Sequence, residues 1–251
     1  MSQPLVIMNF SGMYQSERFY ESSPFSWVDC KDLQGTNCYL DEQARVQLEK
    51  RLEAYPPKGI HFIDSGNYHY MSKLWTDKIK EPFRLVVFDH HTDMQGSLFE
   101  NLLSCGCWVK DVLDHNPYVE KVILIGAEDA LVKQIPEKYF EKIHCISKGD
   151  LLDPGYLDDQ GILHSEVPIY ISIDKDVLGT KEVITNWDQG NLSFRELIEL
   201  LKRLIEQEIL IGVDICGECA ATLNNIYESE EVQKNDQVNH KLLNFFKKIL
   251  S

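Results

Sequence analysis

The apolar residues of this chain gather in short uninterrupted runs, and several of these runs end in acidic residues. A continuous apolar run, unlike an alternating pattern, is typical of a strand that is buried on both faces of a parallel sheet. We predict such strands at residues 5–10, 60–64, 84–89, 121–126, 143–146, 168–174 and 209–214.

Segments with helical spacing of apolar residues alternate with these strands. Asp41 and Ser193 stand where the N-caps of two such helices belong. The predicted helices cover residues 41–53, 71–80, 97–113 (with a break near Cys105), 136–141, 194–206 and 238–250. The alternation predicts an α/β fold in which helices cover both faces of a mainly parallel sheet, and we expect residues 1–251 to form a single domain.

Two of the predicted strands end in alternating acidic positions. Asp89, His91 and Asp93 follow the first of them, and Asp174 and Asp176 follow the second. Residues two apart in an extended strand point to the same side, so these side chains are expected to meet at the carboxyl edge of the sheet. Isolated acids at strand ends usually cap turns, but crowded carboxylates repel one another unless a cation or protons intervene. The repeated pattern therefore favours a metal site.

His69, just beyond the strand at 60–64, extends this candidate set to six ligands. Six ligands are enough for two divalent ions when some carboxylates bridge them. Oxygen ligands with a little imidazole favour Mn²⁺, with Zn²⁺ or Fe²⁺ as alternatives. By the same alternation along the strand, His90 and Lys175 point away from the site, and we expect Lys175 to pair with a carboxylate.

Composition narrows the function further. The formal net charge of −15 and the pI of about 4.9 speak against a nucleic-acid partner or an anionic membrane surface. The N-terminus lacks the pattern of a signal peptide, and no run approaches the roughly 20 apolar residues of a membrane helix. The seven cysteines, among them Cys216 and Cys219 in a lone Cys-x-x-Cys, are expected to be reduced and mostly buried. We therefore expect a soluble cytoplasmic protein.

The acidic motifs resemble those of a known enzyme family. The stretch at 89–93, Asp-His-His-Thr-Asp, is similar to the Asp-Ala-His-x-Asp motif of the arginase/agmatinase (ureohydrolase) family, and 172–176, Ser-Ile-Asp-Lys-Asp, resembles its Ser-x-Asp-x-Asp motif. The stretch at 66–69, Gly-Asn-Tyr-His, stands where that family has Gly-Gly-Asp-His. The chain is identified as a divergent member on these motifs and on their order.

The resemblance implies an arginase-like three-layer α/β sandwich with a binuclear Mn²⁺ centre that hydrolyses C–N bonds of guanidino compounds. It implies that Asp89 and Asp174 bridge the two ions. His69 and Asp93 would complete the shell of one ion, and His91 and Asp176 that of the other. The ions would lower the pKa of a water, and Asp93 would hold the proton of the resulting hydroxide. The resemblance also suggests a homo-oligomer.

Several positions depart from the family pattern. Gln95 stands where arginases often have an asparagine tied to the amino-acid substrate, and Cys105-Gly106 replaces a His-Gly pair. The family often ends its last strand in Asp-x-x-Glu, with the glutamate holding the guanidinium, whereas Glu218 here stands one residue late. We expect Glu218 to contact the substrate cation, with a structural acid as the alternative. We also expect Gln95 and Trp187 to contact the substrate, which is predicted to be a guanidino or amidino compound other than free arginine.

Three other functions compete with this one. A non-catalytic metal-binding or regulatory protein on the same fold would account for the altered 105–106 and 217–218 positions. A deacetylase-like amidohydrolase would use a single Zn²⁺. The run Asp89-His90-His91 is also similar to a phosphoesterase signature, but the first strand, residues 5–10, lacks the acids that this family requires.

Overall fold

A central sheet of parallel strands organises the molecule. The computed structural model describes residues 4–97, 102–147, 149–150, 165–206, 208–220 and 229–250. Within them, 8 strands form one sheet in the order β2-β1-β4-β10-β9-β5-β7-β8, and each of its pairings is parallel. The strands are β1 (Leu5–Asn9), β2 (Ser26–Asp29), β4 (Gly59–Phe62), β5 (Phe83–Phe88), β7 (Val119–Ile125), β8 (Ile143–Ile146), β9 (Ile169–Asp174) and β10 (Leu210–Cys216). The predicted α/β class and parallel sheet are confirmed.

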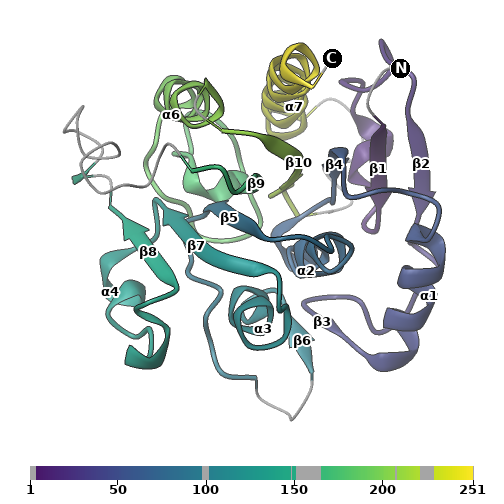
Figure 1. Cartoon of the computed structure of the whole chain (residues 1–251). Helices are drawn as coiled ribbons and strands as arrows, with labels where there is room; N and C mark the ends of the chain where they lie inside the picture. Colours follow the sequence, from purple (N-terminus) through teal and green to yellow (C-terminus); the bar gives the residue numbers. More distant parts are fainter. Residues whose placement is uncertain are drawn as a thin grey trace.

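Helices lie on both faces of this sheet (Figure 1). The longer ones are α1 (Glu42–Leu52), α2 (Met71–Thr76), α3 (Trp108–His115), α6 (Phe194–Glu206) and α7 (Glu230–Ile249). Helices α1, α2 and α3 pack in one hydrophobic cluster, and α6 and α7 pack in another. Strand β5 serves both, because Leu85 and Val87 belong to the first cluster while Val86 and Phe88 belong to the second. This alternation is the reason why the strands read as continuous apolar runs.

Local capping follows the prediction. The Asp41 side chain accepts a hydrogen bond from the Ala44 backbone at 2.8 Å and begins α1. Ser193 and Glu196 form a reciprocal capping box at the start of α6, because the Ser193 hydroxyl accepts from the Glu196 backbone and the Glu196 carboxylate accepts from the Ser193 backbone. Both contacts satisfy backbone N–H groups that a helix leaves unpaired in its first turn.

Two predictions about the elements are wrong. The helix predicted at 97–113 begins only at Trp108, and Leu103–Ser104 before it forms the strand β6, which pairs with β3 (Tyr39–Leu40) in a small antiparallel ribbon. Residues 98–101 of that prediction lie outside the described part of the chain. The segment 11–40, for which no element was predicted, contains both β2 and β3. The short helix expected at 136–141 is a single 3-10 turn, η3 (Glu137–Tyr139), preceded by α4 (Asp129–Val132).

The strand order brings distant segments together. Strands β4, β10, β9 and β5 are neighbours in the middle of the sheet, although their positions in the sequence are far apart. Their carboxyl ends therefore meet at one edge, where parallel sheets place ligand sites. Among the described helices, none has the length and apolar character needed to cross a membrane.

Candidate metal centre

The six predicted ligands converge at the carboxyl edge of β4, β5 and β9. Asp89, His91 and Asp93 follow β5, and His69 follows the turn η2 (Gly66–Tyr68) after β4. Asp174 is the last residue of β9, and Asp176 lies in the 3-10 turn η5 (Lys175–Val177) that follows it. Together with their neighbours they line one cavity of about 240 Å³. The full lining is Cys38, Tyr39, Gly66, His69, Asp89, His91, Asp93, Gln95, Ser104, Cys105, Gly106, Asp174, Asp176 and Trp187.

The first half of the site is built around His69. Its Nδ1 atom lies 3.1 Å from Asp93 Oδ2, 3.2 Å from Asp89 Oδ2 and 3.6 Å from Asp174 Oδ2. Asp93 is held for this contact by Trp108, whose indole Nε1 donates to Asp93 Oδ2 at 2.6 Å. The imidazole and all three carboxylates are buried, so a positive charge placed among these four groups would be poorly screened by water.

A chain of hydrogen bonds fixes the orientation of the His69 ring. Ser172 Oγ lies 2.9 Å from His69 Nε2 and donates its own proton to Asp214 Oδ1 at 2.6 Å. Ser172 must therefore accept from Nε2, which leaves Nδ1 to face the carboxylates. A bare lone pair there would point at negative charge, so the arrangement suits a cation at Nδ1. Histidine ligands of metals are usually oriented by a contact of this kind on the other ring nitrogen.

The second half of the site is built around His91. Its Nδ1 atom lies 2.9 Å from Asp176 Oδ2 and 3.4 Å from Asp89 Oδ1. Asp176 also accepts from the His90 backbone through Oδ1 at 3.0 Å, which holds its carboxylate in place. Asp89 thus turns one oxygen toward each histidine and lies between the two halves. His69, Asp89 and Asp93 form one group of mutually close ligand atoms, and Asp89, His91 and Asp176 form another.

The charges of this cluster are not balanced by the protein itself. Burial, reinforced by the negative charge of Asp176, raises the pKa of Asp174 to about 7. Burial and the charge of Asp89 likewise raise the pKa of Asp176 to about 6. Burial opposes a charge on His91, but its hydrogen bonds to Asp176 and Asp89 outweigh that effect and raise its pKa to about 12. Retained protons relieve the repulsion among these carboxylates, and a bound cation could relieve it in the same way.

The remaining cavity wall comes from loops. Gln95 and Trp187, both predicted to contact substrate, line the cavity. Trp187 is anchored by its Nε1 atom, which donates to Asn67 Oδ1 at 2.9 Å. Gly66 must lack a side chain, because a Cβ there would lie 2.8 Å from Trp187 Cδ1 and 3.0 Å from Asp174 Oδ2. Tyr39 is a wall residue that sequence reasoning missed, since no local pattern announces the pairing of β3 with β6.

The structure corrects the expectation for Glu218, which is fully buried and does not line the cavity. Its carboxylate pairs with Lys175, the residue between the two aspartates of the second motif, and also accepts from Asn235 at 2.9 Å. Gly217, with φ 92°, turns the backbone just before Glu218, whose side chain contacts Lys175 and Asn235 instead of the cavity. Lys175 pairs with a carboxylate, as predicted.

Comparison with known proteins identifies the family of this chain. The sequence model of the Arginase family matches residues 9–228. The chain belongs to the arginase family. An uncharacterized protein of Thermotoga maritima is 31% identical over 247 residues, which cover 97% of this chain and 90% of that protein. An N(1)-aminopropylagmatine ureohydrolase of Thermococcus kodakarensis is 24% identical over 176 residues, 69% of this chain, and the match spans only 58% of that enzyme.

Solved structures agree with the fold. Proclavaminate amidino hydrolase from Streptomyces clavuligerus superposes with a TM-score of 0.71 at 12% identity, covering 99% of this chain and 92% of that one. The predicted arginase-like fold is therefore confirmed. Membership also confirms the predicted enzyme class at the level of the family, because arginase-family members are ureohydrolases.

Proposed function

We propose that this protein is a binuclear, manganese-dependent hydrolase that cleaves a C–N bond of a guanidino or amidino compound. The observation that carries the proposal is the position of Asp89, whose two oxygens face the separate groups built around His69 and His91. A carboxylate in this position can bridge two cations. Asp174, with one oxygen near His69, is the second proposed bridge. The oxygen-rich donor set suits Mn²⁺, with Zn²⁺ or Fe²⁺ as alternatives.

The proposed chemistry divides between the ions and the chain. When bound, two divalent ions would lower the pKa of a water and polarise the substrate carbon. Asp93, fixed by Trp108, takes the proton of the attacking water and returns it to the leaving nitrogen. His69 is kept in one tautomer by Ser172 and presents Nδ1 to the centre. The loops that carry Gln95 and Trp187 hold the substrate against the centre and exclude water.

The cavity wall supports a substrate other than free arginine. Among the described residues that line the cavity, each charged side chain belongs to the proposed ligand set. The rest of the wall is uncharged and includes Tyr39, Gln95, Ser104 and Trp187. The charged amino and carboxylate groups of an amino acid would find no fixed partner on this wall, and burying them unpaired is costly. We infer a small substrate whose distal part is uncharged or weakly polar.

The same inference covers the cellular setting. We propose a cytoplasmic protein that acts on a small molecule, with neither nucleic acid nor a membrane as partner, and a homo-oligomeric state in keeping with the family. The free thiols of all seven cysteines support a reducing compartment. The acidic net charge of −15 supports the absence of a nucleic-acid partner.

Metal content and hydrolysis test the proposal together. After loading with Mn²⁺ and removal of loose ions, elemental analysis should find about two Mn²⁺ per chain. Release of urea or ammonia is then measured with a panel of alkylguanidines, guanidino acids and amidines. Asp93→Asn should lower turnover of the best substrate by about 10²-fold or more. Asp32→Asn, a surface carboxylate paired with Arg51, is the matched control and should retain turnover.

Each contrary result favours a particular alternative. A folded protein that binds two ions and hydrolyses no compound of the panel would support a non-catalytic metal-binding protein. One Zn²⁺ per chain with release of acetate from acetylated amines would support deacetylase-like chemistry. A folded protein that binds no ion would refute the metal centre.

A further inference from the structure

Cys216 stands at the last position of β10, directly beside the candidate metal centre. Its side chain is fully buried. It points to the same side of the strand as Asp214, two residues earlier, which receives the Ser172 hydrogen bond that orients His69. The pairing of β10 with β9 places Cys216 opposite Asp174. Along the paired strands β9 and β10, Cys216 and Asp174 come two residues after Asp214 and Ser172, nearer the carboxyl edge of the sheet where the cavity lies.

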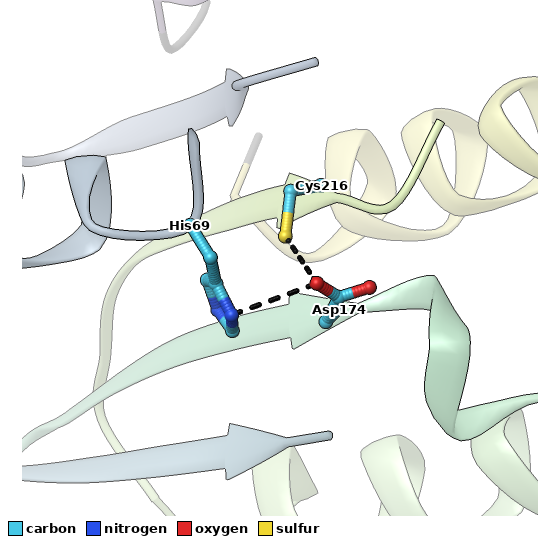
Figure 2. A group of neighbouring side chains, drawn as sticks. All are labelled: His69, Asp174 and Cys216. Atoms are coloured by element: carbon cyan, nitrogen blue, oxygen red, sulfur yellow. Dashed lines mark hydrogen bonds and ion pairs between the residues drawn. The ribbon is translucent and has the colours of Figure 1, made fainter. Parts of the chain in front are cut away.

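The sulfur atom makes contact with two proposed ligands. Cys216 Sγ lies 3.1 Å from Asp174 Oδ2, and the same carboxylate oxygen lies 3.6 Å from His69 Nδ1 (Figure 2). The imidazole nitrogen, the carboxylate oxygen and the sulfur all lie within 4.8 Å of one another and form a third group of close ligand atoms. Three donors at these separations can share one ion.

The two halves of the candidate metal centre differ in the donor atoms that they offer. The half built around His69 has a sulfur atom next to its nitrogen and oxygen donors, whereas the group of Asp89, His91 and Asp176 has oxygen and nitrogen alone. Thiolate is a soft ligand that prefers Zn²⁺, Co²⁺ or Fe²⁺ to the harder Mn²⁺. The geometry thus separates a mixed-donor half from an oxygen-rich half.

We propose that Cys216 is an additional ligand of the ion in the His69 half and makes that half selective for Zn²⁺, Co²⁺ or Fe²⁺ over Mn²⁺. The inference rests on the proposed metal centre and assigns different ions to its two halves. On binding, the thiol releases its proton to solvent and a sulfur lone pair forms the bond to the ion, so the step needs no oxidant. The oxygen-rich half remains the Mn²⁺ position.

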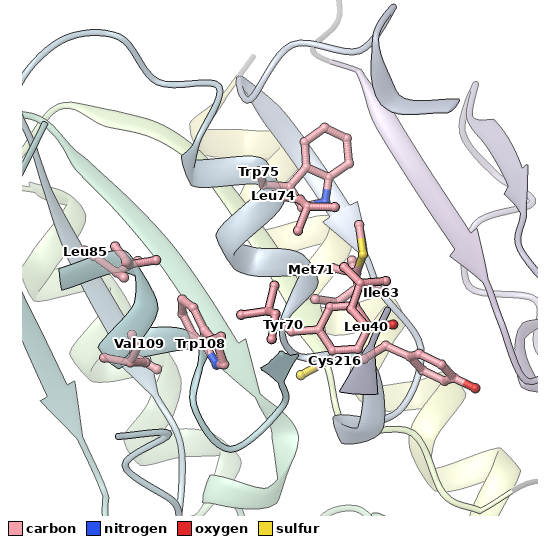
Figure 3. Packing of buried hydrophobic residues seen from close by; sticks show 14 of the residues in the cluster. Leu40, Ile63, Tyr70, Met71, Leu74, Trp75, Leu85, Trp108, Val109 and Cys216 are labelled. Carbon is pink, nitrogen blue, oxygen red and sulfur yellow. The ribbon is translucent and has the colours of Figure 1, made fainter. Parts of the chain in front are cut away.

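Packing is the competing role for Cys216. The residue belongs to the hydrophobic cluster that contains Tyr70, Met71 and Trp108 (Figure 3). A cysteine that only packs would tolerate replacement by a side chain of similar size without any change in metal preference. A ligand would not, because serine oxygen is a harder donor than sulfur. Measuring the metal preference of a Cys216 variant therefore distinguishes a ligand from a packing residue, even if both roles affect activity equally.

Cobalt provides a direct probe. Metal-depleted protein is titrated with Co²⁺, and the near-ultraviolet sulfur-to-cobalt charge-transfer band is recorded. The band should appear in the wild type and in Cys105→Ser, whose cysteine lines the same cavity outside the ligand groups, and should be lost in Cys216→Ser. In a second measurement, the protein is equilibrated with equal Zn²⁺ and Mn²⁺ and the bound ions are counted. The wild type should bind more Zn²⁺ than Mn²⁺, and Cys216→Ser should lower the bound Zn²⁺-to-Mn²⁺ ratio by about 10-fold or more.

The outcomes distinguish this inference from the proposed function. Bound Co²⁺ without the band in the wild type overturns the role of Cys216, whether or not the variant folds. An unchanged band or an unchanged ion ratio in Cys216→Ser overturns it as well. In all these cases the metal centre itself survives. A folded wild type that binds no ion overturns both proposals.

Discussion

Two clusters of charged side chains meet at the end of β9, and they treat charge in opposite ways. The cavity cluster comprises His69, Asp89, His91, Asp93, Asp174 and Asp176. The buried network comprises Glu17, Lys175, Glu218, Asn235 and Asn239, all shielded from solvent. Lys175 separates Asp174 from Asp176 in the sequence, yet it points to the other side of the backbone. One strand end therefore supplies both clusters.

The members of the buried network pair mainly with one another, although Glu17 Oε1 has no hydrogen-bond partner among the described residues. Lys175 pairs with the Glu218 carboxylate and donates to Asn239 Oδ1 at 2.8 Å. Asn239 donates to Glu218 and to Glu17 at 2.8 and 2.7 Å. Burial and the nearby Glu218 charge raise the pKa of Glu17 well above its usual range, which favours the neutral form of Glu17 beside the Lys175–Glu218 pair. Among the described residues, the four carboxylates of the cavity cluster have no lysine or arginine paired with them. This surplus of carboxylates, rather than charge alone, is what favours a metal site there.

The largest expected effect follows from opening the buried network. Lys175→Met removes the cation and leaves Glu218 buried without a partner. A buried pair that loses one member destabilises a protein by roughly 3 to 5 kcal/mol, and we expect a loss of this size in the free energy of unfolding. Urea denaturation of the metal-free protein measures it.

A double variant provides the control for that experiment. Lys175→Met with Glu218→Gln removes both charges, so a substantial part of the lost stability should return. If Lys175→Met alone is as stable as the wild type, or if the double variant recovers nothing, the network does not act as a closed ion pair.

His61 is a buried histidine outside both clusters, and its pKa gives a pH-dependent prediction. His61 on β4 stacks on the Trp75 ring at 3.7 Å and contacts the Tyr170 hydroxyl at 3.1 Å. Burial lowers the pKa of His61 to about 3, although a backbone hydrogen bond opposes the shift. The unfolded chain binds a proton near pH 6.5 and the folded chain does not, so stability is lost as pH falls from about 6.5 toward 3. His61→Phe should remove this loss.

The measurement compares slopes rather than absolute stabilities. Urea denaturation at pH 6.5 and 4.5 should show a drop in the wild type that exceeds the drop in His61→Phe by roughly 2 to 3 kcal/mol. Other titrating groups are shared by both proteins and cancel in the difference. Parallel stability curves for the two proteins would mean that His61 is protonated in the fold.

The sequence predicted the sheet and the cavity cluster for the same physical reason. Strands buried on both faces must be apolar throughout, so acidic residues can come only where the strands end, and this is where they stand. Alternation alone does not explain their positions: β5 ends at Phe88, Asp93 has a φ of 49°, and Asp176 lies in the 3-10 turn η5, so the turns after the strands bring these side chains together. The sequence also predicted that Lys175 points away from the cavity and pairs with a carboxylate, as it does with Glu218.

The wrong predictions involve contacts between distant segments. Pairing of β3 with β6 draws Leu103–Ser104 into a strand and delays the helix to Trp108, and no feature near residue 103 announces its partner at residue 40. Glu218 was expected at the substrate because the family often ends its last strand in Asp-x-x-Glu, and Glu218 stands one residue beyond that position. Its position is decided instead by the turn at Gly217 and by Lys175, Asn235 and Asn239. The pairing of β3 with β6 and the position of Glu218 are therefore determined by tertiary packing rather than by the local sequence pattern.

The smallest expected effect is the change in the free energy of unfolding caused by Asp176→Asn, and it tests the comparison most sharply. Loss of the Asp176 charge should stabilise the metal-free protein, whereas loss of the charge on its neighbour Lys175 should destabilise it. Burial and the Asp89 charge raise the pKa of Asp176 to about 6, so in the metal-free protein its carboxylate binds a proton more tightly in the folded state than in the unfolded state. That contribution is lost as pH rises from about 4 through 6, and above this range the ionised carboxylate destabilises the fold. Asp176→Asn should therefore stabilise the metal-free protein by roughly 1 to 2 kcal/mol at pH 8.

Urea denaturation at pH 8 in a chelator tests the sign, and the same series with Mn²⁺ tests its origin. With Mn²⁺ present, the wild type should gain stability from the ion and the Asp176→Asn variant should gain less, because it has lost a ligand. Asp188→Asn is the matched control: this carboxylate is also near His91, at 3.8 Å, but its side chain is 79% exposed, so its removal should change little. A destabilised Asp176→Asn in chelator would mean that the cavity cluster, like the buried network, is already closed by the protein. Neighbouring residues with opposite signs would instead show that one strand end carries a structural charge on one side and a set of metal ligands on the other.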